Sequence, residues 1–368
     1  MAKSWLRKTG KKSFIIFNVI VGLLFLIAAL SPFINPANWW LHGFLALITP
    51  FIIVVLLLLM FTWLIIRPYF AVIPLAFLLI GFKQIKVVFA WNISSDFVKA
   101  KAKNTLRIID WNIHGFNGSG GVGSVKKNVR LELAESVLKN KPDIICFQEF
   151  NSALYENNIA LFSKTHPYHY FSKDYSTGNN GHYAMGVIIF SSLPIIDSGR
   201  VAFPNDESVI YVDILNGIDT MRIFTTHLQS FKFQKGDYED IEHIKESDAA
   251  SISASKSIMR KMKIAYKKRG VQADIVHNEL AKSPHPTIIC GDFNDVPNSY
   301  TYFTIKQHLK DAFLEKGFGI GRSFVSLSPT LRIDYILADP TFEVNQFDML
   351  DESLSDHNML MADIRFKK

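Results

Sequence analysis

The stretch "TIICGDFNDVP", residues 287–297, joins a short apolar run directly to a cluster of polar residues. Its first four residues are apolar or β-branched, which predicts a buried strand. Two aspartates and an asparagine follow at once, Asp292, Asn294 and Asp295. A rigid sheet holds reactive groups well at the ends of its strands. Taken alone, however, the stretch also fits an Asx turn, and Asp295 is read as a turn residue ahead of Pro297.

The same pattern recurs along the second half of the chain, with a carboxylate, amide or imidazole at or near the end of an apolar run. The runs are RIIDWNIHG at 107–115, DIICFQEF at 143–150, RIFTTHLQS at 222–230, RIDYIL at 332–337 and LSDHNML at 354–360. One such residue is most often a cap or a turn residue. The repetition in six places favours a shared functional site.

Strand-like and helical patterns alternate in this region. Strands are predicted at 106–112, 143–149, 184–190, 209–215, 222–227, 287–291, 333–337 and 359–366, and helices at 129–139, 248–268 and 299–309. The pair Asn216-Gly217 is a strong signal for a hairpin turn. Many strands with hairpins and interspersed helices predict an α+β fold in which two packed sheets are flanked by helices.

The first hundred residues differ in composition from the rest. Up to Lys103 the chain has 11 Lys or Arg and one acid, Asp96, out of 40 and 33 in all, which leaves 29 basic and 32 acidic residues afterwards. The basic charge therefore belongs to the front. A formal charge of about −3 after Lys103 weakens a reading of that part as a general nucleic-acid binder.

Three apolar stretches, 14–30, 41–66 and 69–82, are nearly free of charge. The first two are near or above the ~18–20 residues that cross a bilayer as a helix. The third is shorter unless it continues to Trp91, so either three spans or two spans and an interfacial segment are expected. Residues 1–91 are thus predicted to be a membrane anchor with three transmembrane helices, 92–103 a linker, and 104–368 one catalytic domain.

Charge predicts the orientation. Five basic residues precede the first span, and the loop 31–40 has none, which places the N-terminus in the cytoplasm. Three spans then place the domain on the extracytoplasmic side of the cell membrane, although Lys99, Lys101 and Lys103 argue the other way. Cys146 and Cys290 lie in strand-like runs and are expected to be buried free thiols.

The residue types fit phosphate-ester hydrolysis. A hard cation such as Mg²⁺ (or Mn²⁺) takes oxygen ligands, which Asn112, Glu149 and Asp356 offer. The cation neutralises phosphoryl charge while a base activates water. His357 oriented by Asp334 is the predicted base. Zinc fits less well because the chain has no CxxC or HExxH motif.

The ordered set WNIHG, FQEF, THLQS, GDFNDVP, RIDYIL and SDHNML closely resembles the endonuclease/exonuclease/phosphatase superfamily over residues 104–368. The resemblance implies a four-layered α/β sandwich with the site at one end of the sheets. It further implies that Glu149 is the principal metal-binding glutamate and that Asn112 lies near metal and phosphate. Asp356 and His357 match the terminal SDH motif, and Asp334 matches the aspartate that pairs with its histidine. Asp292 and Asn294 match the GDxN pair, which positions the nucleophile or leaving group and contacts phosphate. His227 matches a histidine that contacts phosphate or assists the leaving group in deoxyribonuclease I and sphingomyelinases.

Three functions follow from these observations. The leading hypothesis is a membrane-anchored, metal-dependent phosphoesterase that favours phosphodiesters, with a lipid headgroup or a nucleic acid as substrate and no protein partner. The alternatives are a nuclease acting on DNA or RNA, and a non-catalytic binding module on a membrane anchor. The acidic stretch 237–246 and a basic helix are interpreted either as substrate or headgroup contacts or as a solvated surface. The basic residues of that helix are Lys256, Arg260, Lys261, Lys263, Lys267, Lys268 and Arg269. The Gly-rich loop 118–123 is read as a flexible loop by the site.

Overall fold

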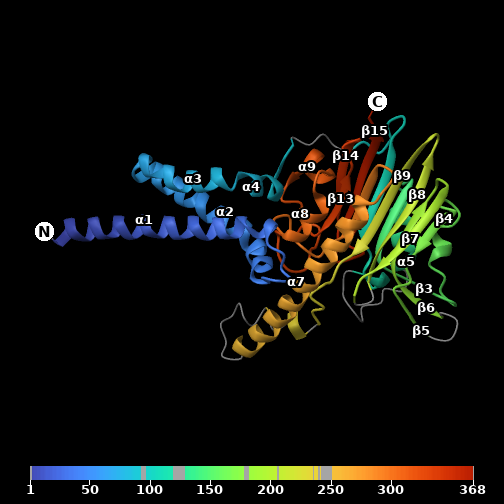
Figure 1. The fold of residues 1–368 in the computed structure, drawn as a ribbon, viewed down its shortest axis with the longest axis horizontal. Helices are drawn as coiled ribbons and strands as arrows, with labels where there is room; N and C mark the ends of the chain where they lie inside the picture. Colours follow the sequence, from blue (N-terminus) through green and yellow to red (C-terminus); the bar gives the residue numbers. More distant parts are fainter. Residues whose placement is uncertain are drawn as a thin grey trace.

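The computed structural model describes residues 2–92, 97–118, 129–177, 182–204, 207–234, 236–238, 241 and 251–367. Two parts are visible in it: a helical arm built from residues 2–88 and a β-sandwich that contains the remaining described residues (Figure 1). The N-terminus lies at the far tip of the arm, and the C-terminus lies in the sandwich. Much of the Gly-rich loop and of the acidic stretch 237–246 lies outside the described residues.

The helical arm consists of helices that run back and forth. They are α1 (Ala2–Ala29), η1 (Ser31–Phe33), α2 (Leu41–Ile66), η2 (Pro68–Ala71), α3 (Val72–Ile80) and α4 (Phe82–Val88). Two helical segments, Gly10–Phe33 and Leu41–Ile66, are long and apolar enough to cross a membrane. The third apolar stretch is bent by 72° between its two halves, so the arm has a third candidate span only if the bent pair counts as one.

Two large sheets form the sandwich. The six-stranded sheet has the order β11 (Lys310–Asp311), β13 (Asp334–Ala338), β10 (Thr287–Asp292), β9 (Asp219–His227), β8 (Ser208–Asn216) and β7 (Ile195–Ala202). The seven-stranded sheet has the order β14 (Phe342–Leu350), β15 (Met359–Phe366), β2 (Leu106–Asn112), β3 (Ile144–Ala153), β6 (Tyr183–Ser191) and β4 (Tyr168–Phe171), with β5 (Tyr175–Thr177) also on β6. Each sheet contains one parallel pair, β9 with β10 and β2 with β3.

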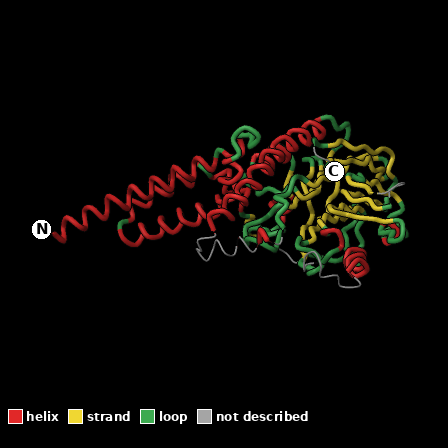
Figure 2. Tube along the Cα trace, turned by 90° about the horizontal axis from the view of Figure 1, so that it is seen from below, coloured by secondary structure: helices red, strands yellow, loops and turns green. Residues whose placement is uncertain are grey.

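Helices cover the outer faces of both sheets. Ile108, Ile144, Ile210 and Ile288 belong to a core between the sheets that is closed to solvent. Separate apolar clusters lie under α5 (Val129–Leu138) on one face and under α7 (Ser251–Ala281) and α8 (Tyr300–Lys306) on the other. Figure 2 shows the strands as one block beside these helices. The predicted four-layered sandwich is confirmed.

All eight predicted strands are present, with ends that shift by a few residues. The sequence reading missed β7 and β14 and the shorter strands. It also ended the helix at residue 268, whereas α7 continues to Ala281. Glycine normally favours a helix end, but Gly270 lies inside α7. A Cβ at this position would lie 2.2 Å from Asn35 Oδ1 of the arm, which accounts for the glycine by close packing. Both cysteines are buried and free, as predicted.

The arm packs directly on the sandwich. The Asn298 side chain is buried and donates to Thr49 Oγ1 at 2.9 Å and to Ala28 O at 3.3 Å. Arg332 donates to Val87 O at 2.8 Å. A short pair of strands, β1 (Ala90–Trp91) and β12 (Phe318–Gly319), adds a further connection. These contacts set the position of the arm relative to the sheets.

Candidate active site

The predicted site residues gather around one pocket of about 180 Å³ at one end of the two sheets. The polar residues of the prediction that line it are Glu149, His227, Asp292, Asn294, Asp356 and His357. Asn112 and Asp334 are buried behind them, each in hydrogen-bond contact with a lining residue. The fold thus brings together residues separated by up to 245 positions in sequence.

Strand register brings three of these side chains together. His227 and Asp292 are direct neighbours on the parallel strands β9 and β10. Asp292 and Asp334 are direct neighbours on the antiparallel strands β10 and β13. Because opposed residues on one sheet have Cβ atoms about 5 Å apart, these acidic and basic groups are forced into contact.

A β-bulge directs Glu149 toward the pocket. The pairing of β3 with β6 shifts register between Phe147 and Phe150, and Glu149 has a φ of 52°. A positive φ is uncommon outside glycine and persists only where surrounding structure enforces it. Gln148 remains in the core and donates to Asp110 Oδ1 at 2.8 Å. The bulge therefore separates a core amide from a pocket carboxylate on adjacent residues.

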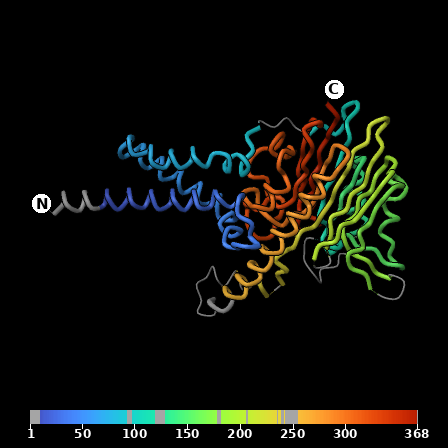
Figure 3. Tube along the Cα trace, in the orientation of Figure 1, coloured from blue at the N-terminus to red at the C-terminus, as the bar shows by residue number. Residues whose placement is uncertain are grey.

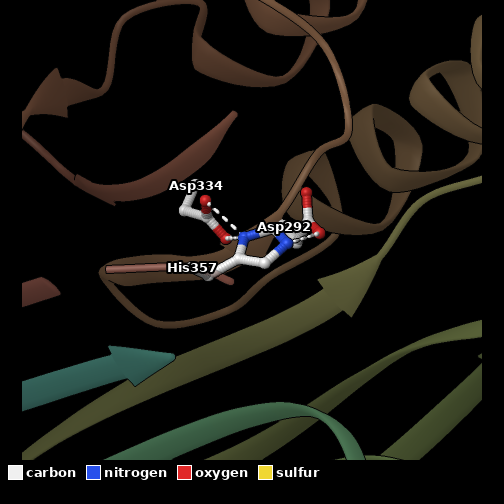
Figure 4. A group of neighbouring side chains, drawn as sticks. All are labelled: Asp292, Asp334 and His357. Atoms are coloured by element: carbon white, nitrogen blue, oxygen red, sulfur yellow. Dashed lines mark hydrogen bonds and ion pairs between the residues drawn. The ribbon is translucent and has the colours of Figure 1, made fainter. Parts of the chain in front are cut away.

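The His357 ring lies between two buried carboxylates (Figure 4). Its Nδ1 is 2.9 Å and 3.1 Å from the two oxygens of Asp334, and its Nε2 is 3.8 Å from Asp292 Oδ2. Burial lowers the pKa of His357, but Asp334 and Asp292 outweigh it and raise the pKa to about 10. Burial and the Asp334 charge in turn raise the pKa of Asp292 to about 6. The two carboxylates therefore favour the protonated form of the His357 ring.

Surrounding contacts hold His357 in place. Its carbonyl oxygen accepts from Trp111 Nε1 at 2.8 Å, and its backbone N–H donates to Ser355 Oγ at 3.2 Å. The ring also packs on Phe324 with centroids 4.9 Å apart. A side chain fixed on several sides needs little reorganisation during a reaction.

His227 and Asn294 form the second polar wall. Asn294 Nδ2 lies 3.1 Å from His227 Nε2 and donates to Leu228 O at 2.9 Å. Burial lowers the pKa of His227, but Glu207, Asp292 and Glu149 raise it overall. The backbone N–H of Asn294 donates to Asp292 Oδ1 at 2.8 Å, which is the Asx turn that the sequence also allowed. Asp292 and Asn294 therefore form an Asx turn and also line the pocket.

The donor chemistry suits a hard cation. Burial raises the pKa of Glu149, but His227, His114 and the Asn112 amide outweigh it, so the pKa lies below its ordinary value. Glu149 and Asp356 both present partly exposed carboxylates to the pocket, with 27% and 20% of the side chain accessible. Oxygen ligands of this kind match Mg²⁺ or Mn²⁺.

The Asn112 side chain connects several groups of the site. Its Oδ1 accepts from the backbone N–H of His114, and its Nδ2 donates to Glu149 Oε1 at 3.2 Å and to Asp292 Oδ2 at 3.0 Å. It therefore joins the two carboxylates. Among the described residues, the group whose potential ligand atoms lie within 4.8 Å of one another is Asp292, Asp334 and His357. The ring of His357 is already committed to Asp334 in that group.

Two residues of the site were not assigned from the sequence. His114 Nδ1 lies 3.6 Å from Asp356 Oδ1, and Glu207 Oε1 lies 3.7 Å from His227 Nδ1. His114 belongs to the WNIHG motif. Its position two residues after Asn112 could have indicated that it lies in the site. Glu207 precedes β8 in a segment without a distinguishing pattern, and only the tertiary structure brings it to His227.

Comparison with known proteins supports the fold. The model of the endonuclease/exonuclease/phosphatase family matches residues 111–357, and a domain of unknown function matches residues 11–88. The human Nocturnin catalytic domain with bound sulfate anion is 19% identical, covering 73% of this chain and 97% of that one, with a TM-score of 0.51. Sphingomyelinase C from Streptomyces griseocarneus is 17% identical, covering 70% and 99%, with a TM-score of 0.44.

A family member from Beutenbergia cavernae is 18% identical, covering 72% of each chain with a TM-score of 0.49. At these identities the solved structures show likeness of fold alone. No curated protein sequence matches the chain. The family match covers two thirds of the residues and contains all eight predicted site positions. The chain therefore belongs to the endonuclease/exonuclease/phosphatase family.

Proposed function

We propose that the protein is a membrane-anchored, divalent-cation-dependent phosphodiesterase. The observation that carries the proposal is His357 held between Asp334 and Asp292, beside the pocket carboxylates Glu149 and Asp356. A buried, fixed imidazole–carboxylate pair next to oxygen ligands combines proton transfer with charge neutralisation. A His–Asp pair with a purely structural role would not require the solvent-accessible carboxylates of Glu149 and Asp356 beside it.

The reaction is hydrolysis of a phosphate ester. The oxygen of water bonds to phosphorus and gives up a proton, one P–O ester bond breaks, and the leaving oxygen takes up a proton. His357 Nε2, which lies 3.8 Å from Asp292 Oδ2, accepts the proton of the water as the base and returns it to the leaving oxygen, while Asp334 fixes the ring through Nδ1. Asn294 and His227 contact the phosphoryl oxygens, and Asp292 positions the attacking or leaving oxygen. A cation held by Glu149 and Asp356, with Asn112 bracing Glu149, supplies neutralisation of the phosphoryl charge.

The nuclease alternative depends on a basic track for the nucleic-acid backbone. Among the described residues that line the pocket, Lys232 is the one lysine or arginine. Nucleic-acid affinity comes largely from several lysine or arginine contacts to phosphates, so a short phosphodiester is the better fit.

We also propose that residues 1–91 anchor the chain in the cell membrane through three spans, with 104–368 as the catalytic domain. The support is the pair of long apolar helices and the bent third segment. Because the helices run back and forth, the domain then lies on the opposite side of the bilayer from the N-terminus (Figure 1). The basic residues before the first span place that side outside the cytoplasm.

The test uses the full-length protein in detergent with bis-para-nitrophenyl phosphate as substrate. We expect turnover that chelator abolishes and Mg²⁺ or Mn²⁺ restores. Glu149→Gln should lower kcat at least about 100-fold and weaken cation binding measured by calorimetry. Glu156→Gln is the matched control because Glu156 is an exposed glutamate that follows the same strand. Chelator-resistant turnover, or equal kcat in the two variants, would contradict the proposal.

A further inference from the structure

The lining of the active-site pocket is apolar as well as polar. Beside the carboxylates and histidines it includes apolar side chains from segments far apart in sequence. They are Leu47, Phe231, Phe233, Val296, Phe324, Leu327, Leu331 and Ile333. Such apolar side chains contribute little to the binding of a fully polar phosphodiester. They would bind the hydrocarbon part of an amphipathic substrate.

One residue of that wall belongs to the helical arm. Leu47 lies on α2, and it packs with Phe44 in the cluster that contains Phe231, Phe233 and Tyr266. The rings of Phe231 and Phe233 stack with centroids 5.2 Å apart, and Phe231 meets Tyr266 edge to face at 5.5 Å. The apolar residues Leu47, Phe231 and Phe233 of the pocket therefore pack against the beginning of the candidate membrane span Leu41–Ile66.

The height of the pocket relative to the bilayer follows from the contacts of Asn298. It binds Ala28 O near the end of α1 and Thr49 Oγ1 of α2, and it lies four residues after Asn294 of the site. Figure 3 shows the orange segment that contains it beside the blue residues of the arm. Further toward the tip, apolar side chains such as Ile20 and Phe51 are about half exposed. The sandwich thus begins where the lipid-facing surface of the arm ends.

The side of the sandwich next to the arm is basic. Lys256, Arg260 and Lys263 of α7 border a shallow hollow together with Trp40, which directly precedes α2. Lys263 Nζ lies 5.6 Å from the Trp40 ring centroid. Tryptophan and basic side chains in such a position match the headgroup layer of a membrane. Figure 1 shows the N-terminal half of α7 extending beyond the sandwich, below the arm in this view.

We propose that the pocket takes the phosphate of a phosphodiester lipid directly from the leaflet beside the arm, and that Leu47, Phe231 and Phe233 hold the adjoining hydrocarbon. The inference rests on the proposed function and adds its substrate class. The anchor then has a second role, since α2 supplies a specificity-determining residue of the site. Hydrolysis consumes one water and yields a lipid alcohol with a phosphorylated headgroup, or a phosphorylated lipid with a free headgroup alcohol.

The test compares lipid and soluble esters with the full-length protein in vesicles. Separate vesicles carry phosphatidylcholine, phosphatidylethanolamine, phosphatidylglycerol or sphingomyelin, which distinguishes the glycerol from the sphingoid source and one headgroup from another. Bis-para-nitrophenyl phosphate and plasmid DNA are the substrates without hydrocarbon. We expect at least one lipid to be hydrolysed with a higher kcat/KM than either.

Leu47→Ser and Phe231→Ser should each lower kcat/KM for that lipid about 10-fold more than for the soluble ester, because a buried apolar side chain contributes on that order. Leu58→Ser is the matched control, since Leu58 is a 60% exposed leucine on the same helix. An equal loss for both esters, a preference for DNA, or turnover of the soluble ester while none of the four lipids is hydrolysed would overturn the inference. Absence of turnover on every substrate would instead overturn the proposed function.

Discussion

Replacing Asp334 by asparagine tests whether the orientation of His357 drives the reaction. Asp334 is 1% exposed and contacts His357 Nδ1 through both oxygens, at 2.9 Å and 3.1 Å. Asparagine keeps the shape but removes the charge that fixes the ring and its proton. A positioned proton-transfer group contributes about 10²–10⁴-fold, so kcat on bis-para-nitrophenyl phosphate should fall by about 10³-fold, or about 4 kcal/mol of barrier. KM should change by only a few fold.

Stability should change much less than activity. The Asp334→Asn variant would lose a charged hydrogen bond, which costs about 1–3 kcal/mol, but it would also relieve the repulsion that raises the pKa of Asp292. Asp213→Asn is the matched control because Asp213 is a buried carboxylate on the same sheet, paired with Arg222 at 2.6 Å and far from the pocket. The control should lose thermal stability without loss of kcat. If Asp334→Asn keeps kcat within threefold, or loses activity only as its folded fraction falls, the assigned role of Asp334 is refuted.

Three further predictions concern the cation, the arm and pH. Glu149→Ala and His357→Ala should each nearly abolish turnover while circular dichroism stays unchanged, and unchanged activity in either would remove that residue from the site. Gly43→Ala places a Cβ 2.3 Å from the Tyr266 ring and should cost about 1–3 kcal/mol by overpacking, whereas Gly10→Ala meets nothing within 4 Å and should be neutral in a thermal melt. Burial lowers the pKa of His166, so the folded state binds fewer protons than the unfolded state, and stability should fall as pH drops below about 6.5. His166→Gln should reduce the difference between melting temperatures at pH 7.5 and pH 5.5, and an unaltered difference would contradict this account.

Local patterns determined much of the fold. Alternating and continuous apolar runs located the eight principal strands, and the bounds of α2 match the predicted span 41–66. These features are encoded within a few neighbouring residues, because strand burial and helix length depend on nearby hydrophobicity. The edge strand β7 was missed because none of its residues is buried and its exposure does not alternate, so its sequence IIDSGRVA lacks the strand pattern. The end of α7 was predicted wrongly because glycine often ends a helix, whereas Gly270 allows close packing against Asn35, which is 235 residues away.

The sequence by itself determined which residue types follow the strands and therefore which chemistry the chain carries, since each motif is local and its order along the chain is visible. Only the tertiary structure decided how those groups face one another. The bulge turns Glu149 into the pocket, Asn112 uses its amide N–H to join two carboxylates, and Leu47 of the arm becomes part of the pocket wall. Such arrangements depend on the packing of segments that are far apart in the chain, by 37 and 180 residues for the two carboxylates that Asn112 joins. No local pattern of hydrophobicity or charge specifies that packing.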